Sequence, residues 1–432
     1  MLLTGLVIFT AASFVCGAAG NVALLNAARA LQGVGAALQL SSALAILSHE
    51  FRGAERARAF AFWGAVVGIA ISLGPVAGGF ITETLGWEWA FYVNLPVGLT
   101  MIALSVINLT ESRDLAATRI DISGFVSFTL FLFLTTLALI SGNRSGWTSL
   151  AILLECAGAV ILFTIFITIE TLQRQPMLDL GFFRRPTYIG ANIASVAFAA
   201  TMLAMLSYLP IYLQSGLGYG AQTAGLLMLP MAIPLFLMPR VVVAQLTHRL
   251  TGRALLTIGL CLVSAGLLWM GLEAPRFEYW MMLGGMLVAG TGAGILNGEV
   301  AKVSMTVIPP ERAGMASGVG GTARFSGVVV GFAALGAVLF TRVSHVVAAG
   351  LPSALPADRL ALVRNVTAGD LSGSRHALAL ASFGAGYQAI LLVAAMIAAT
   401  AALLSWLLIR ASETAAIPRH GRGISGHVSV VE

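Results

Sequence analysis

The sequence predicts an all-α integral membrane protein. Of its 432 residues, 58% are hydrophobic and 10% are charged, and the mean hydropathy is +0.92. Soluble domains carry roughly 25% charged residues. A helix needs about 20 apolar residues to cross a hydrocarbon core roughly 30 Å thick. Apolar runs of suitable length predict about twelve helices, near residues 2–20, 24–47, 58–80, 91–108, 122–140, 149–170, 187–211, 222–245, 254–272, 279–307, 315–340 and 383–409.

The basic residues alternate between loops, which predicts the orientation of the chain. Lys302 is the only lysine, so the net charge of +6 comes almost wholly from arginine. Cytoplasmic loops carry an excess of Lys and Arg. The basic-rich set is therefore predicted to be cytoplasmic, with the C-terminus, whereas the alternate short loops hold only Arg144 and Arg276. This set comprises loops 48–58, 109–121, 171–186, 246–253 and 308–314 and the tail after 409. The long loop 341–382 is expected outside.

Several classes of function find no support in the residues. The basic residues lie in short loops rather than in a patch, so no nucleic-acid partner is predicted. The three cysteines lie inside apolar helices without pairing spacing, so we expect no disulfide, metal or redox role for Cys16, Cys156 and Cys261. No phosphate-binding loop, zinc-spaced His/Cys set or nucleophile elbow occurs, so we expect no enzyme, no cofactor and no use of ATP.

The second predicted span places polar groups on one helical face. Arg29 and Gln32 share an arc of roughly 120° with several small residues. A charged side chain at mid-membrane costs at least about 2.5–3.5 kcal/mol, so Arg29 is expected to face a protein interior or a water-filled cavity. The alternative is that Arg29 lies near the outer interface and extends its guanidinium into water.

The third predicted span is unusually rich in glycine. Six residues fall within an arc of roughly 140° on the helix, namely Gly64, Gly68, Gly74, Pro75, Gly78 and Gly79. The proline frees one backbone carbonyl and favours a kink. This face predicts either a close helix–helix contact of the small-xxx-small kind or a hinge.

The composite of this glycine face and the residues after it resembles a family signature. A GxxxG pattern and a GPxxGG pattern are followed by W-x-W-x-F-x-x-N-x-P-x-G from Trp87 to Gly98. This string resembles the drug:proton antiporters of the major facilitator superfamily, and in particular their 14-span branch. The stretch from Tyr208 to Pro230 resembles the same family. The resemblance implies a major facilitator fold in which the glycine–proline helix is a hinge and a seal between two halves.

The resemblance also divides the chain. It implies four remaining helices of an N-terminal bundle in 1–108, an inserted helix pair with its linkers in 109–182, a six-helix bundle in 183–410 and a cytoplasmic tail in 411–432. The match begins at the third helix of the family, so about twelve of an expected 14 spans are present. We expect that the first two helices are absent either because the start codon is assigned too late or because the gene is truncated.

Four residues are candidates for proton coupling or for lining the cavity. The pattern R-x-x-Q-G-x-G at Arg29 and Gln32 resembles a family motif whose arginine is implicated in coupling. Glu299 and Lys302 are three residues apart and can form a neutralising pair, or Glu299 can accept a proton or a cationic substrate. Arg324 lies about ten residues into its span, in a pattern that resembles the penultimate helix of the family, and is expected to line the central cavity or contact an acid.

The predicted function is secondary export of amphipathic drugs, antibiotics or metabolites by proton antiport with alternating access. The expected partners are the small-molecule substrate, protons and the lipid bilayer of the bacterial cytoplasmic membrane. The alternative is a truncated membrane protein that does not transport, either a remnant or a regulatory or binding subunit. Substrate identity and oligomeric state are left open.

Overall fold

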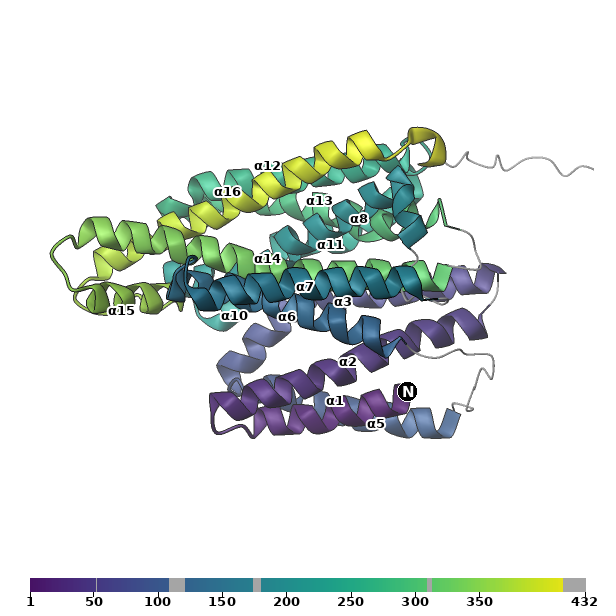
Figure 1. The fold of residues 1–432 in the computed structure, drawn as a ribbon, viewed down its shortest axis with the longest axis horizontal. Helices are drawn as coiled ribbons and strands as arrows, with labels where there is room; N and C mark the ends of the chain where they lie inside the picture. The colour runs from purple at the N-terminus through teal and green to yellow at the C-terminus, as the bar shows by residue number, and fades with distance from the viewer. Residues whose placement is uncertain (52, 109–120, 174–179, 309–312, 415–432) are drawn as a thin grey trace, which may run out of the picture.

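The computed structural model describes residues 1–51, 53–108, 121–173, 180–308 and 313–414. All regular secondary structure in these ranges is helical (Figure 1). Eight helical segments there are long and apolar enough to cross a membrane, and a ninth results if α10 (Ala221–Leu227) and α11 (Leu229–Val241), bent by 42°, form one broken span. The all-α membrane fold class is therefore confirmed, and the number of twelve spans stays a prediction.

The N-terminal helices form a group at the bottom of Figure 1. It contains α1 (Leu2–Gly17), α2 (Val22–Glu50), the short α4 (Trp89–Tyr92) and α5 (Asn94–Asn108). Helices α1 and α2 approach so closely that only glycine fits at two positions. A Cβ added at Gly5 would lie 2.9 Å from the Gln39 backbone nitrogen, and one added at Gly35 would lie 2.6 Å from the Phe9 backbone nitrogen. Small residues therefore set this packing, as is common between membrane helices.

Helix α3 (Gly53–Thr84) leads away from that group towards the second bundle (Figure 1). Its contacts are with α10 and α11 more than with α2 and α4. Pro75 lies inside the helix, as the sequence predicts. Helix α3 is therefore the element that links the two halves of the described chain.

The chain that follows forms two adjacent helices, α6 (Ile122–Ser145) and α7 (Leu150–Leu172), and their assignment as an inserted pair stays a prediction. The Asp121 carboxylate accepts a hydrogen bond from the Gly124 backbone N–H at 2.7 Å and caps α6. Aromatic rings hold the two helices together, with centroids 5.1 Å apart for Phe128 and Phe166. Helix α6 packs on α14 (Ala313–Gly350), so the pair lies against the second bundle.

The second bundle holds the main hydrophobic core. It begins after a short 3₁₀ turn, η1 (Leu180–Arg184), and its elements are α8 (Pro186–Phe198), the π-helical turn η2 (Ala199–Leu203), α9 (Ala204–Ile211), the π turn η3 (Tyr212–Gly216), α10, α11, the π turn η4 (Val242–Leu246), α12 (Gly252–Glu273), the 3₁₀ turn η5 (Ala274–Arg276), α13 (Tyr279–Met305), α14, α15 (Pro356–Thr367) and α16 (His376–Leu408). Helices α12 and α13 are close-packed because Gly266 lies against the backbone of Gly285 and Ala289.

The prediction of a long loop over 341–382 is wrong. Helix α14 continues to Gly350, and α15 follows after five residues. The apolar-run criterion ended the helix at residue 340, shortly before the charge of Arg342, but a helix continues past a charged residue as long as its backbone hydrogen bonds are satisfied.

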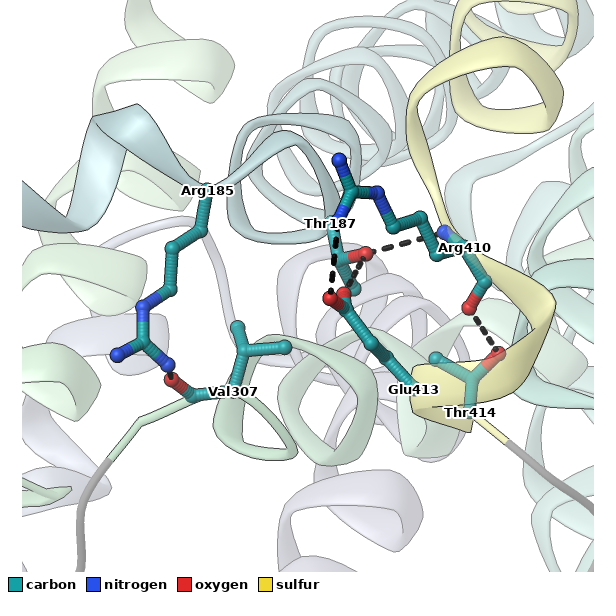
Figure 2. A network of polar contacts seen from close by, with 6 residues as sticks. All are labelled: Arg185, Thr187, Val307, Arg410, Glu413 and Thr414. Carbon is teal, nitrogen blue, oxygen red and sulfur yellow. Dashed lines mark hydrogen bonds and ion pairs between the residues drawn. The ribbon is translucent and has the colours of Figure 1, made fainter.

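A polar network ties the end of the second bundle where the chain leaves α16 (Figure 2). The Thr187 hydroxyl donates to the Glu413 carboxylate and accepts from the Arg410 backbone N–H at 3.0 Å. Arg410 and Glu413 also form an ion pair at 3.7 Å. The segment η7 (Ala411–Thr414) is thereby fixed to the start of α8. On the other side of this end, Arg185 donates to the Val307 carbonyl, so the helices of this half are tied together.

Candidate functional site

The contact between α3 and α10 joins the two halves backbone to backbone. A Cβ added to Gly79 would overlap the Ala221 carbonyl oxygen, and a Cβ at Gly225 would lie 2.5 Å from the Pro75 carbonyl oxygen. The Glu83 carboxylate accepts a hydrogen bond from the Gln222 backbone N–H and so caps the first turn of α10. We call Pro75, Gly79, Glu83, Ala221, Gln222 and Gly225 the inter-half seam.

The predicted glycine face is therefore only partly in contact. Gly79 and Pro75 belong to the seam, whereas added Cβ atoms at Gly74 and Gly78 would meet nothing within 4 Å. The surroundings of Gly64 and Gly68, which lie earlier in α3, fall outside what the structure describes. Both interpretations stay open. The contact at Gly79 fits a close helix–helix contact, and the open space at Gly74 and Gly78 leaves room for α3 and α10 to move against each other.

Arg29 and Gln32 lie together in the N-terminal group. The Arg29 guanidinium donates to the Gln32 side-chain oxygen at 2.5 Å and lies 5.7 Å from the Phe91 ring centroid. The Gln32 amide in turn donates to the Ser13 hydroxyl at 2.7 Å, and Ser13 donates to the Phe9 carbonyl. Gln32 and Ser13 are buried. Arg29 is thus the first member of a hydrogen-bond chain of neutral groups, Gln32 and Ser13, that connects α2 to α1.

Arg324 is held by an amide rather than by an acid. Its guanidinium donates to the Asn297 side-chain oxygen at 2.9 Å and lies 5.1 Å from the Phe198 ring centroid. Gly327 and Gly331, one and two turns further along α14, lie against the backbone of α8 and of the π turn η2. This close approach sets α14 next to Phe198. Within the described residues Arg324 makes no ion pair, so its charge is compensated only by dipoles and an aromatic face.

Glu299 is buried on α13 and pairs with Lys302. Both carboxylate oxygens lie 3.3 Å from the Lys302 ammonium nitrogen, and Glu299 is 1% exposed while the Lys302 side chain is 43% exposed. The neutralising pair that the sequence allows is present. It places a titratable carboxyl inside the protein with its partner reaching towards the surface.

The predicted site residues form three separate groups, not one. Arg29 and Gln32 are together, Glu299 is with Lys302, and Arg324 is with Asn297. Asn297 and Glu299 are two residues apart on α13 and so point to different faces. The sequence analysis missed Ser13 and Asn297; an amide or hydroxyl inside an apolar helix is the signal that identifies such partners.

An apolar cavity of about 640 Å³ lies between α8, α14 and α16; Ala323, the residue before Arg324, lines it, whereas Arg324 itself is not among its lining residues. Ligand pockets commonly have volumes of about 300–1,000 Å³ and apolar walls with a few polar groups. Alanines create much of the space, and Asn192 and Thr400 supply the polar groups. The alanines that line it are Ala197, Ala200, Ala323 and Ala401.

Comparison with known proteins places these features in a family. A family model described as Major Facilitator Superfamily matches residues 1–332. The chain is 34% identical over 357 residues to the multidrug resistance protein Stp of Mycobacterium tuberculosis, covering 82% of this chain and 66% of that protein. It is 34% identical to the methylenomycin A resistance protein of Streptomyces coelicolor, covering 78% and 71%, and 32% identical to the probable actinorhodin transporter of the same species, covering 79% and 61%. The chain spans about two thirds of the length of these relatives.

Solved structures support the same fold. A bacterial homolog of the human lysosomal transporter Spinster, in an inward-facing and occupied conformation, aligns with a TM-score of 0.59 at 14% identity over 96% of this chain and 83% of that chain. A proton dependent oligopeptide transporter aligns with a TM-score of 0.56 at 14% identity over 94% and 83%. The predicted major facilitator fold is confirmed.

Replacing Asn297 by Leu should lower the free energy of unfolding by about 1–3 kcal/mol, because the partly buried Arg324 guanidinium loses its hydrogen-bond acceptor. Thermal unfolding in detergent measures this change. The double variant Asn297→Leu with Arg324→Met should recover most of the loss, since neither polar partner is then left unpaired. Additive losses in the double variant would refute the contact.

Proposed function

Because the chain belongs to the Major Facilitator Superfamily, we propose that it is a secondary active exporter of amphipathic drugs, antibiotics or metabolites, driven by proton antiport. The relatives named for multidrug resistance, methylenomycin A resistance and actinorhodin transport support this substrate class. The chain is a multi-pass protein of a bacterial membrane. We further propose that its C-terminus is cytoplasmic, on the arginine distribution of the loops.

The inter-half seam is the observation that carries the proposal. Alternating access needs two halves that separate and rejoin as rigid bodies around a site near the midplane. A contact made by glycine backbones can close without a gap and open without rearranging side chains, because Gly79 and Gly225 have none to interdigitate. The 14-span branch is proposed on the inserted pair, because α6 packs on α14 as an addition to the second bundle.

The proposed proton carrier is Glu299. A guanidinium stays protonated in proteins, so Arg29 and Arg324 can bias a neighbouring acid but cannot carry the proton. Proton uptake converts the Glu299 carboxylate to a neutral acid and releases Lys302 from its ion pair. Glu299 is two residues from Asn297 on α13, and Asn297 accepts the hydrogen bond of Arg324 on α14. A change of charge at Glu299 can therefore affect α14, which forms part of the wall of the apolar cavity. Gln32 is proposed to hold Arg29 in the other half.

Substrate binding is proposed at an apolar surface rather than at a charged one. The walls of the 640 Å³ cavity are almost wholly apolar. They suit the hydrophobic part of an amphipathic molecule, while Asn192 and Thr400 can accept or donate hydrogen bonds. No step needs ATP, because a proton gradient supplies the free energy.

Replacing Gly79 by Leu should block transport, because the new side chain would separate α3 from α10 and cost about 1–3 kcal/mol in the closed state. Dye efflux from cells that express the full-length gene product measures the effect. The matched control is Phe80→Leu, a 50% exposed position next to Gly79 on α3 and outside the glycine face, which should transport like the wild type. Equal loss in both variants, or in neither, would contradict the seam.

Replacing Glu299 by Gln should abolish efflux driven by a pH gradient while leaving substrate exchange at equal pH intact, because the halves can still move but no proton is carried. Everted vesicles allow both measurements. The control is Glu273→Gln, which removes the acid of another i,i+3 pair, formed with the 60% exposed Arg276. Gradient-driven efflux that survives in Glu299→Gln would exclude this residue as the proton carrier.

A further inference from the structure

A second cavity lies where the inserted helix pair meets the second bundle. Its volume is about 380 Å³, and it is bounded by the α6–α7 turn, by the part of α14 beyond its middle and by α16. It is separate from the 640 Å³ apolar cavity and from the inter-half seam. Its lining residues are Trp147, Ala337, Val338, Thr341, Arg342, His345 and Ala389.

One end of this cavity is lined by two basic residues, Arg342 and His345. Arg342 and His345 are three residues apart on α14 and so lie on one face, with the Thr341 hydroxyl next to them. Within the described part of the chain, neither the guanidinium nor the imidazole has a hydrogen-bond or ion-pair partner. Glu155, in the second turn of α7, forms no ion pair with either. Both side chains are exposed, so an anion can reach them.

The rest of the cavity is apolar and lies at the membrane boundary. Ala337 and Val338, one turn before Arg342, and Ala389 of α16 form the apolar walls. Trp147 follows the apolar span Ile122–Gly142 by five residues, and its ring lies against Gly142. Tryptophan is enriched at the membrane–water interface. Because Trp147 and Arg342 line the same cavity, we infer that Arg342 lies at the depth of the lipid head groups.

We propose that this cavity binds an anionic phospholipid, with the phosphate on Arg342 and His345 and the start of an acyl chain along Ala337 and Val338. A phosphate is a suitable partner for Arg342, because a guanidinium and a phosphate form strong charge-assisted hydrogen bonds. The apolar walls favour a lipid over a free anion, because inorganic phosphate would leave those walls in contact with water. The lipid would bridge the α6–α7 turn and α14 and so hold the inserted pair on the second bundle.

Retention of lipid by the purified full-length protein tests the proposal. The protein is exchanged into detergent with phosphatidylglycerol or phosphatidylcholine of matched chains, and native mass spectrometry counts the lipids that remain bound. We expect selective retention of phosphatidylglycerol. In Arg342→Gln its apparent affinity should fall roughly fivefold, the worth of one arginine near a charged membrane surface. Ala389→Phe, which fills the cavity and keeps both basic residues, should also lose the lipid.

The control is Arg364→Gln, which removes an exposed arginine on α15 and should retain phosphatidylglycerol like the wild type. Equal retention by wild type, Arg342→Gln and Ala389→Phe would overturn the proposal. Equal retention of phosphatidylcholine would overturn it as well, since the cavity would then not select an anion. Displacement of the lipid by excess inorganic phosphate would identify a small-anion site instead.

Discussion

The contact of α3 with α10 depends on the absence of side chains at two positions. At Gly79 and Gly225 the backbones of the two halves are so close that a single added carbon would collide with a carbonyl oxygen. This constraint explains why α3 leaves the N-terminal group and lies against the second bundle (Figure 1). The C-terminal network of Figure 2 binds the helices of the second bundle to one another. Motion is therefore expected at the seam and not within the second bundle.

The predicted site residues have mostly neutral partners, and of the two arginines Arg29 is exposed and Arg324 is partly buried. Arg29 is held by Gln32 and Arg324 by Asn297, while Glu299 alone of the predicted site residues has a charged partner. Dipoles compensate a cation at a lower desolvation cost than a second buried charge would. A carboxyl that pairs with a partly exposed lysine can change its charge without stranding a buried cation. This difference separates the proposed proton carrier from the two arginines.

Much of the fold follows from the sequence, because hydrophobic run length and glycine position are local signals. The helical class, the two helices α6 and α7 and the proline inside α3 were all predictable from such signals. The hydrogen-bond partners of the site residues were not predictable, because they are distant in sequence: Asn297 and Arg324 are 27 residues apart, and Ser13 and Gln32 are 19 residues apart. Helix ends beyond the apolar runs were also missed, as the continuation of α14 to Gly350 illustrates. The division of the glycine face into contacting and open halves depends on where α10 lies, which only the fold determines.

The most direct test of the account is a distance across the seam. Spin labels at Thr84, at the end of α3, and at Tyr219, just before α10, are both on exposed positions. Double electron–electron resonance on the full-length protein, with and without a transported dye and at two pH values, reports whether the halves separate there. We expect two distance populations whose ratio changes with substrate and pH. A single distance that is unchanged under all conditions would contradict alternating access at this seam.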